Sequence, residues 1–233
     1  MKKINILLSL LLIILFSSCD KEQDLNIKMT NINSGNLIIQ VVDNDGNSIS
    51  NARIKVLNYS TELFDEFSDE QGQYNFGKVL SGTYYIEIED VIVSDREYFP
   101  RKTIQIIAGE DKTVRINVEE YVGTMIFTVI TNLGYPVYND TTVANVTIAL
   151  IPSEEYEYNF DFDELLDIST HSQTTNSEGI ATFSDIPSNL YYYQLIYIDS
   201  DNYQVTGTYS VGKQDEEEID IYVDDDIFGV LFE

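Results

Sequence analysis

The chain has 233 residues with 40 acidic and 13 basic side chains, which gives a net charge of −27. A surface this acidic repels phosphate backbones and the sequence has no basic stretch, so DNA and RNA are excluded as partners. Because 43% of the residues are hydrophobic, with 17 Tyr and 11 Phe, the chain is not an acidic disordered protein and can form packed cores.

Residues 1–18 are typical of a secretory signal peptide. Two lysines precede the apolar stretch 4–16, which is too short to span a bilayer because spanning takes roughly 20 residues. The stretch leads to Cys19, the only cysteine, and the run 15–19 resembles a lipobox. We therefore expect cleavage before Cys19, a diacylglyceryl group on its thiol, an acylated amine and stable attachment to a membrane. The alternative is an ordinary signal peptide that ends in a cysteine.

Residues 19–34 have no strand pattern and are expected to form a flexible tether. Within them, the acidic, lysine-containing run 20–24 resembles the surface-export signal of Bacteroidetes lipoproteins. That resemblance implies an outer-membrane lipoprotein of a Gram-negative bacterium, exposed at the cell surface. Since lipidation would consume Cys19, no disulfide is expected, and stability must come from burial.

An internal repeat divides the remainder into residues 35–121 and 122–226, followed by an apolar tail at 227–233. The matching segments are 35–46 with 123–134, 69–79 with 176–186, 82–88 with 189–195, and 108–118 with 211–223. Asn189 takes the place of a glycine in the first copy, which is reasonable because both residue types tolerate positive φ. The copies have almost no linker between them, so we expect them to stack end to end with limited freedom.

Apolar and polar residues alternate with a period of two along short β-branched or aromatic runs, and Gly, Asn and Asp turns separate these runs. This pattern predicts an all-β fold of two tandem antiparallel Ig-like or transthyretin-like β-sandwich domains, without a long amphipathic helix. The residues expected to be buried are Leu37, Ile39, Val41, Ala52, Ile54, Val56, Tyr74, Phe76, Tyr84 and Ile86 in the first copy, and Phe127, Val129, Val146, Ile148, Phe183, Ile186, Tyr191 and Tyr193 in the second.

The first copy has a recognisable order of motifs. A glycine and a V-x-D strand lead to an Asp-Gly turn and an Asn-Ala pair, and then to a D-x-x-G-x-Y-x-F run at 69–76 and a G-x-Y-x-I strand at 82–86. This order resembles the carboxypeptidase regulatory-like family of transthyretin-like, Cna B-type sandwiches, over nearly all of 35–121 and more loosely over 122–223. The resemblance implies a scaffold whose glycines and aromatics are structural, and it carries no catalytic residue.

Some Cna B-type domains close an isopeptide bond between a lysine on the first strand and an asparagine on the last, beside a buried acid. Asn117 and Glu87 match two of these three groups. No lysine lies in 35–45 or in 123–134, where the first strand of each copy is expected. We therefore expect no isopeptide bond.

His171 is the only histidine, and it lies in a polar stretch with no Gly-x-Ser-x-Gly motif nearby. We interpret it as a surface residue. Zinc sites need several His or Cys ligands, which this chain cannot supply. No enzyme activity is expected, although a pair of carboxylates as in glycosidases stays open because acids are plentiful.

Clustered acids make calcium the one cofactor to consider, since it prefers hard oxygen ligands. The clusters are residues 43–46, 161–163 and 199–201, and the run Asp224, Asp225 and Asp226, which is the best candidate. The alternative for 43–46 is a hairpin turn, and for the other clusters it is solvated surface charge.

Aromatic and acidic residues alternate strictly over residues 155–163. As a strand, this segment would place Tyr156, Tyr158, Phe160 and Phe162 on one face, as a surface for a glycan or a protein. The alternative is that this face covers the core. The absence of Trp counts against a dedicated glycan-binding module.

These observations favour a non-catalytic, lipid-anchored cell-surface protein that acts as a binding or spacer module for protein or glycan partners. One alternative is a fimbrial or adhesin-type subunit that donates the apolar tail 227–233 as a strand, although docking of the tail onto its own second copy is favoured. The other alternative is an accessory domain protein of a surface enzyme.

Overall fold

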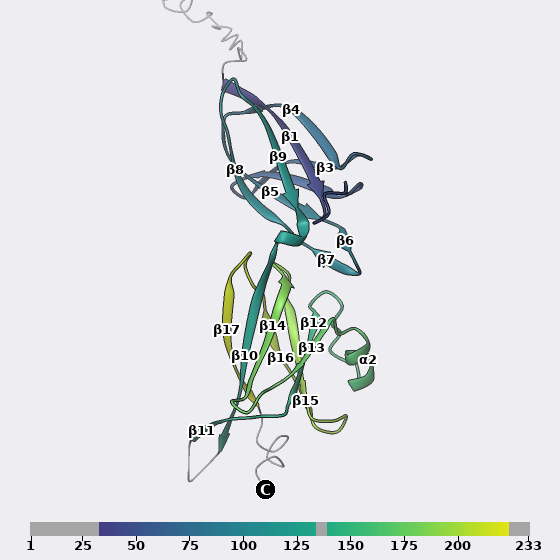
Figure 1. The fold of residues 1–233 in the computed structure, drawn as a ribbon, viewed down its shortest axis with the longest axis vertical. Helices are drawn as coiled ribbons and strands as arrows, with labels where there is room; N and C mark the ends of the chain where they lie inside the picture. The colour runs from purple at the N-terminus through teal and green to yellow at the C-terminus, as the bar shows by residue number, and fades with distance from the viewer. Residues whose placement is uncertain (1–32, 134–138, 224–233) are drawn as a thin grey trace, which may run out of the picture.

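The computed structural model describes residues 33–133 and 139–223 (Figure 1). The first group of strands consists of β1 (Ser34–Val42), β2 (Arg53–Asn58), β3 (Thr61–Phe67), β4 (Gln73–Leu80), β5 (Gly82–Glu89), β6 (Val91–Val93), β7 (Arg96–Tyr98), β8 (Arg101–Ile106) and β9 (Asp111–Asn117). The second group consists of β10 (Val122–Leu133), β11 (Asn139–Thr142), β12 (Thr147–Pro152), β13 (His171–Thr174), β14 (Ile180–Pro187), β15 (Tyr192–Tyr197), β16 (Tyr203–Tyr209) and β17 (Glu216–Val223), with the short helix α2 (Phe162–Asp167).

The two groups have the same sheet topology, which confirms the predicted all-β fold and explains the repeat. The first group forms a β4-β1-β9 sheet and a β3-β2-β5-β8 sheet. The second forms a β14-β10-β17 arrangement, with β11 also on β10, and a β13-β12-β15-β16 sheet. Each group also has features of its own, which are the β6-β7 hairpin in the first and β11 and α2 in the second.

One part of the fold prediction is wrong, because the sandwiches are not purely antiparallel. The last strand of each copy lies beside its first strand and runs parallel to it, β9 beside β1 and β17 beside β10. Alternation of side chains reports which face a residue occupies and says nothing about strand direction. The direction is set by the crossover that returns the chain to the first sheet.

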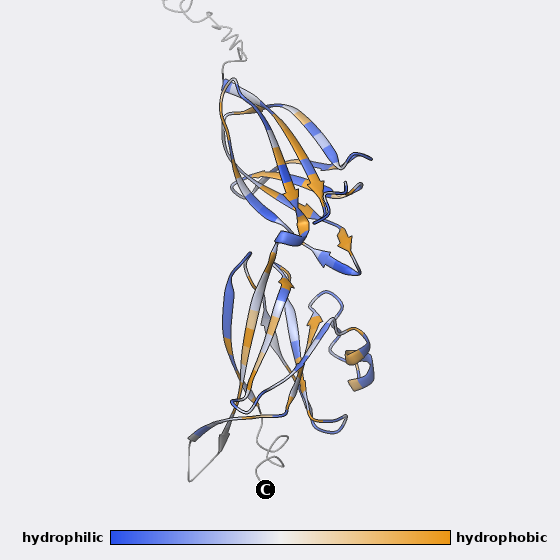
Figure 2. Ribbon diagram, in the orientation of Figure 1, coloured by the Kyte–Doolittle hydropathy of each residue, from blue (hydrophilic) through white to orange (hydrophobic). Residues whose placement is uncertain are grey.

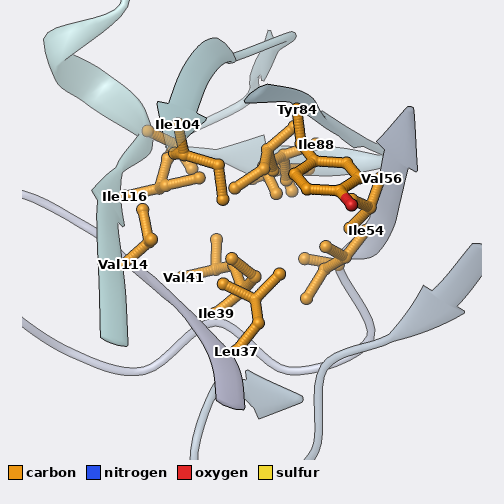
Figure 3. Packing of buried hydrophobic residues seen from close by; sticks show 14 of the residues in the cluster. Leu37, Ile39, Val41, Ile54, Val56, Tyr84, Ile88, Ile104, Val114 and Ile116 are labelled. Carbon is orange, nitrogen blue, oxygen red and sulfur yellow. The ribbon is translucent and has the colours of Figure 1, made fainter. Parts of the chain in front are cut away.

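Each sandwich buries its own apolar cluster between its two sheets. Figure 3 shows Leu37, Ile39 and Val41 of β1 pointing toward Ile54 and Val56 of β2 across the first core. In Figure 2 hydrophobic and hydrophilic segments alternate along the strands, as the period-two pattern predicted. The predicted core residues that are buried are Leu37, Ile39, Val41, Ala52, Ile54, Val56, Tyr84, Ile86, Phe127, Val129, Val146, Ile148, Phe183 and Ile186.

Four predicted core residues lie elsewhere. Tyr74 and Phe76 are half-buried and pack edge to face, with ring centroids 4.7 Å apart, at the margin of the first core. The prediction for Tyr191 and Tyr193 is wrong by one residue, since Tyr192 occupies the core position while Tyr191 is 57% exposed and Tyr193 faces the other side of its sheet. A shift of one residue moves every side chain of a strand to the opposite face.

A glycine turn is repeated in both sandwiches and lies under the first strand. Gly72 and Gly179 have φ angles of 69° and 77°, and their carbonyls accept hydrogen bonds from Val41 and Val129 at 2.8 and 2.9 Å. Asn189, with a φ of 65°, confirms the positive φ expected there. Gly72 and Gly179 have backbone conformations that residues with a Cβ rarely adopt, with Asn among the more tolerant of them.

A buried hydroxyl next to each of these turns escaped the sequence analysis. Ser68 and Thr175 are both 3% exposed. Each hydroxyl accepts a hydrogen bond from a backbone N–H and donates one to a backbone carbonyl. These bonds connect the turn to the residues that precede the second strand of each sandwich. Burial without such partners would be costly, and the two residues are therefore structural.

The sandwiches lie end to end in Figure 1 and meet through a few polar contacts. The backbone N–H of Ser188 donates to the Tyr121 carbonyl at 2.8 Å, and the Asn189 side chain donates to the Phe99 carbonyl at 3.1 Å. A 3-10 turn, η2 (Val118–Glu120), connects β9 to β10.

The predicted lipidation site Cys19, the calcium candidates Asp224, Asp225 and Asp226, and the tail 227–233 lie outside the described residues. Within residues 33–133 and 139–223, no helix has the length and apolar character needed to cross a membrane.

Candidate binding surface

The acidic-aromatic segment 155–163 is not a strand, so that prediction is wrong. It forms turns and then enters α2, which begins with a capping box. The Asp161 carboxylate accepts from the Glu164 N–H at 3.0 Å, and the Glu164 carboxylate accepts from the Asp161 N–H at 2.9 Å. These reciprocal bonds satisfy N–H groups at the helix start and outweigh the alternating pattern.

Three of the four aromatics in this segment cover their own sheet. Tyr156 packs on Tyr193 of β15 with ring centroids 4.2 Å apart, and Phe162 contacts Tyr197 and Tyr203. Phe160 belongs to the same apolar cluster on the outer face of the β13-β12-β15-β16 sheet. Tyr158 alone projects outward, with 94% of its surface exposed.

Replacing Tyr156 with alanine should lower the free energy of unfolding by about 1–3 kcal/mol, because the half-buried ring loses apolar contact and its pairing with Tyr193. Chemical denaturation followed by circular dichroism measures this change. The matched variant is Tyr158→Ala in the same loop, which should alter stability by no more than about 0.5 kcal/mol. Equal losses in the two variants would contradict the packing described here.

None of residues 33–133 and 139–223 covers the equivalent outer face of the first sandwich in this way. In the β3-β2-β5-β8 sheet, Leu57 lies opposite Tyr85, and Lys55 lies opposite Glu87. Tyr85 is 44% exposed and the neighbouring Tyr59 is 83% exposed. Around them is a hollow of about 440 Å³, whose walls come from Leu57, Tyr59, Tyr85, Glu87, Arg101, Lys102 and Thr103. Its volume is within the range of ligand pockets, roughly 300–1,000 Å³.

Acidic and basic side chains on this face form ion pairs with one another. Arg53 Nη2 lies 2.7 Å from Asp65 Oδ2, and Lys55 Nζ lies 2.7 Å from Glu89 Oε2. The hydrogen bond from Arg53 lowers the pKa of the Asp65 carboxyl, and the hydrogen bond to Glu89 raises the pKa of Lys55. The face therefore presents ordered charges rather than a single sign.

Beside the tyrosines, Arg101 Nε lies 3.0 Å from Glu87 Oε1, and its guanidinium also lies 4.8 Å from the centroid of the Phe99 ring. Lys102, the next residue, lies opposite the core residue Ile86 in the register, so its side chain leaves the strand on the other face of the sheet. The rim of the hollow thus offers both hydrogen-bond donors and a carboxylate acceptor next to two phenol rings.

A second hollow, of about 350 Å³, lies where the two sandwiches meet. Glu97 of β7 faces Glu154 of the second sandwich there. Burial, together with the hydrogen bond to Glu154 and the negative charge of Glu154, Asp90 and Glu155, raises the pKa of Glu97 to about 7. One proton is therefore held at the junction under mildly acidic conditions.

This proton makes the stability depend on pH. The folded protein holds it between the ordinary carboxyl pKa of 4.5 and about 7, whereas the unfolded chain has released it. The stabilisation that the Glu97 proton gives the folded state is thus present below pH 4.5 and is lost as the pH rises to about 7. Because solvent screens this partly exposed pair, we expect the free energy of unfolding to fall by about 1 kcal/mol across the window.

Glu97→Gln should remove this dependence, since an amide does not ionise. Urea denaturation at about pH 5 and about pH 8 measures it, with Glu157→Gln on the exposed loop as the control. The Glu97 variant should show a smaller difference between the two pH values than the parent and the control. An unchanged difference would mean that Glu97 carries no proton at the junction.

His171 was predicted to be a surface residue, but it is half-buried. Its ring lies beside that of Tyr192, with ring centroids 6.4 Å apart. Its Nδ1 is 2.9 Å from the Thr170 hydroxyl, and its Nε2 is buried without a hydrogen-bond partner in the described part of the chain. Burial, and then the charge of Arg96, lowers the pKa of His171. A triad needs a carboxylate that orients the second ring nitrogen, and the described residues place none there.

The other acidic clusters serve as caps and turns. Gly46 N–H donates to the Asp43 carbonyl at 3.1 Å, so the hairpin-turn alternative for 43–46 is confirmed. Hydrogen bonds from Asn47 and Asn202 lower the pKa of Asp43 and Asp199, respectively. Across 33–133 and 139–223, no group of three or more His, Cys, Asp and Glu residues is arranged to hold a metal ion.

The open face of the first sandwich was missed by the sequence analysis, although a signal for it exists. The outward positions of β2 and β5 carry charges and a tyrosine, whereas the same positions in β12 and β15 are mostly apolar. The pairs are Lys55 with Ala149, Leu57 with Ile151, Tyr85 with Tyr193, and Glu87 with Leu195. A comparison of the copies position by position would have revealed this difference.

The described residues define an all-β protein of tandem sandwiches. A comparison with solved structures finds several matches. The Bacillus anthracis TIE protein matches with 16% identity and a TM-score of 0.35, over 82% of this chain and 34% of that one. The minor pilin GBS52 of Streptococcus agalactiae matches with 14% identity and a TM-score of 0.34, over 82% and 94% of the two chains. A streptococcal ancillary pilin matches with 12% identity and a TM-score of 0.34, over 80% and 61%.

This chain spans about a third of the length of the TIE protein. Neither a protein-family profile nor a curated protein sequence matches it.

Proposed function

We propose that this protein is a non-catalytic binding module of the cell surface, anchored in the outer membrane of a Gram-negative bacterium through lipid on Cys19. Its ligand surface is the outer face of the β3-β2-β5-β8 sheet. The single observation that carries this proposal is the contrast between the copies. The second covers this face with its own aromatic segment, whereas the described residues of the first leave it open.

The chemistry of the open face supports a binding role. Exposed Tyr59 and Tyr85 offer large, stiff rings whose ordering costs little conformational entropy. Glu87 and Arg101 are already held by their ion pair, so a ligand would meet polar groups that are in place. By contrast, no described residue gives His171 the orienting partner that a catalytic base requires.

Photo-crosslinking on intact cells tests this function. A photoreactive amino acid replaces Thr103, which lines the hollow, or Thr182, an exposed residue of β14 that serves as the control. We expect adducts from position 103 and few from position 182. Protease treatment and periodate oxidation then separate polypeptide adducts from glycan adducts. Equal yields at the two positions, or none at either, would contradict a ligand surface on this face.

The anchor is tested separately by Cys19→Ala. The parent should fractionate with membranes and the variant should not. Retention of the variant in the membrane fraction would refute the lipid anchor without bearing on the binding face.

A further inference from the structure

In the second sandwich, an aromatic ring packs on the outer face of the β13-β12-β15-β16 sheet. Tyr193 lies opposite Ile151 in the sheet register, as Tyr85 lies opposite Leu57 in the first sandwich. The Tyr156 ring packs on Tyr193 with centroids 4.2 Å apart and planes inclined by 34°. Because the two sheets have the same strand order, a ring-shaped group on Tyr85 would occupy the matching place.

The side chains around Tyr193 differ from those around Tyr85, and the difference indicates which kind of group can pack on Tyr85. Beside Tyr193, the outward positions are Leu195 and, on β16, Val205. Beside Tyr85, the same positions are Glu87 and Arg101, joined by an ion pair of 3.0 Å. An aromatic or aliphatic side chain on Tyr85 would remove these charges from water without giving them new partners, which is costly.

The group that occupies this place must pack on the Tyr85 ring and must also give Glu87 and Arg101 hydrogen-bond partners. A saccharide ring does both. One side of a pyranose carries C–H groups that pack on a phenol ring, and its edge carries hydroxyls that both donate and accept hydrogen bonds. Glu87 can accept from such a hydroxyl, whereas Arg101, which uses Nε for Glu87, has further N–H groups to donate. Bonds to charged groups are stronger than those between neutral groups.

The charge balance points to a neutral sugar. Arg101 is matched by Glu87, and Arg53 and Lys55 are matched by Asp65 and Glu89. A uronic or sialic acid would approach a chain with a net charge of −27 and find the basic side chains of this face already paired with carboxylates.

We infer that the hollow around Tyr59 and Tyr85 binds neutral pyranose units of an oligosaccharide, with one ring stacked on Tyr85 and its hydroxyls bonded to Glu87 and Arg101. This inference rests on the proposed function and names the ligand class of the same face.

The test uses the full-length chain, purified in detergent, on an array of neutral hexose and pentose oligosaccharides together with uronic-acid and sialic-acid members. The strongest array ligand is then titrated against three variants. Tyr85→Ala should weaken its binding at least tenfold, Tyr85→Phe should retain binding within about threefold because the ring remains, and Tyr222→Ala on the exposed face of β17 should have no effect. Raising the salt concentration should leave the affinity nearly unchanged, since the sugar is uncharged.

The outcomes separate the two proposals. Binding that is confined to acidic members, or is insensitive to Tyr85→Ala, overturns the saccharide assignment. No binding on the array also overturns it. If Thr103 crosslinks to a polypeptide on cells while the array stays blank, the binding function stands and the saccharide class is wrong. If Thr103 gives no specific adduct and the array is blank, both are wrong.

Discussion

Replacing Phe127 with alanine is expected to lower the free energy of unfolding of the second sandwich by about 3–5 kcal/mol. Phe127 is fully buried on β10, with its ring centroid 5.6 Å from that of Phe183 and 6.3 Å from that of Tyr209. The variant loses the transfer free energy of a whole phenyl ring and leaves a cavity that edge-to-face neighbours cannot fill by small movements.

Hydrogen exchange of backbone amides measures the effect strand by strand. Protection should fall for β10, β12, β14, β15 and β17 and stay close to that of the parent for β1, β2 and β5, because the two cores share no residue. Phe67→Ala is the control, since Phe67 is 53% exposed and its loss should cost about 0.5 kcal/mol or less. Equal loss of protection in both sandwiches would contradict two separately packed cores.

The second large effect is expected for Gly72→Ala. Gly72 has a φ of 69°, and an added Cβ would lie 2.6 Å from the Val41 carbonyl oxygen and 3.0 Å from the Ile49 nitrogen. The unfavourable φ costs about 1–2 kcal/mol, and the close backbone contacts add about 1–3 kcal/mol, so the loss of stability should be about 2–5 kcal/mol.

Gly77→Ala provides a control that isolates the contacts from the φ angle. Gly77 has a φ of 67°, and a Cβ there meets nothing within 4 Å. Its loss should therefore be limited to about 1–2 kcal/mol. Thermal and urea denaturation of the two variants measures the difference. If both variants lose the same stability, the approach of Gly72 to the first strand contributes nothing.

The architecture was predictable because its signals are local and occur twice. Alternation in β1 and β10 identified which residues face the cores, and the repeated glycine before β4 and β14 marked a turn that backbone geometry requires. Strand direction was not predictable in this way, since the parallel pairing of β1 with β9 joins residues far apart in the sequence. The one-residue error at Tyr191 arose because the two copies were aligned by residue type, and one added residue before β15 reverses its faces.

The binding surface was harder to predict because it depends on what covers a face. The segment containing Tyr156 and Phe162 alternates like a strand, but its capping box and tertiary contacts favour turns and a helix. The open face around Tyr85 has no motif of its own. It becomes apparent only from the strand register, which places Leu57, Tyr85 and Thr103 side by side. The second sandwich then shows the equivalent tyrosine, Tyr193, covered by the ring of Tyr156.

The most direct test of the account is the yield of photo-crosslinks from position 103 on intact cells, compared between a chain with Tyr85→Ala and a chain with Tyr222→Ala. Both tyrosines are exposed, at 44% and 55%, and they lie on different sandwiches. The Tyr85 variant is expected to lose most of the adduct, whereas the Tyr222 variant is expected to retain it. Equal adduct from both variants would show that the open face of the first sandwich is not where the protein holds its ligand.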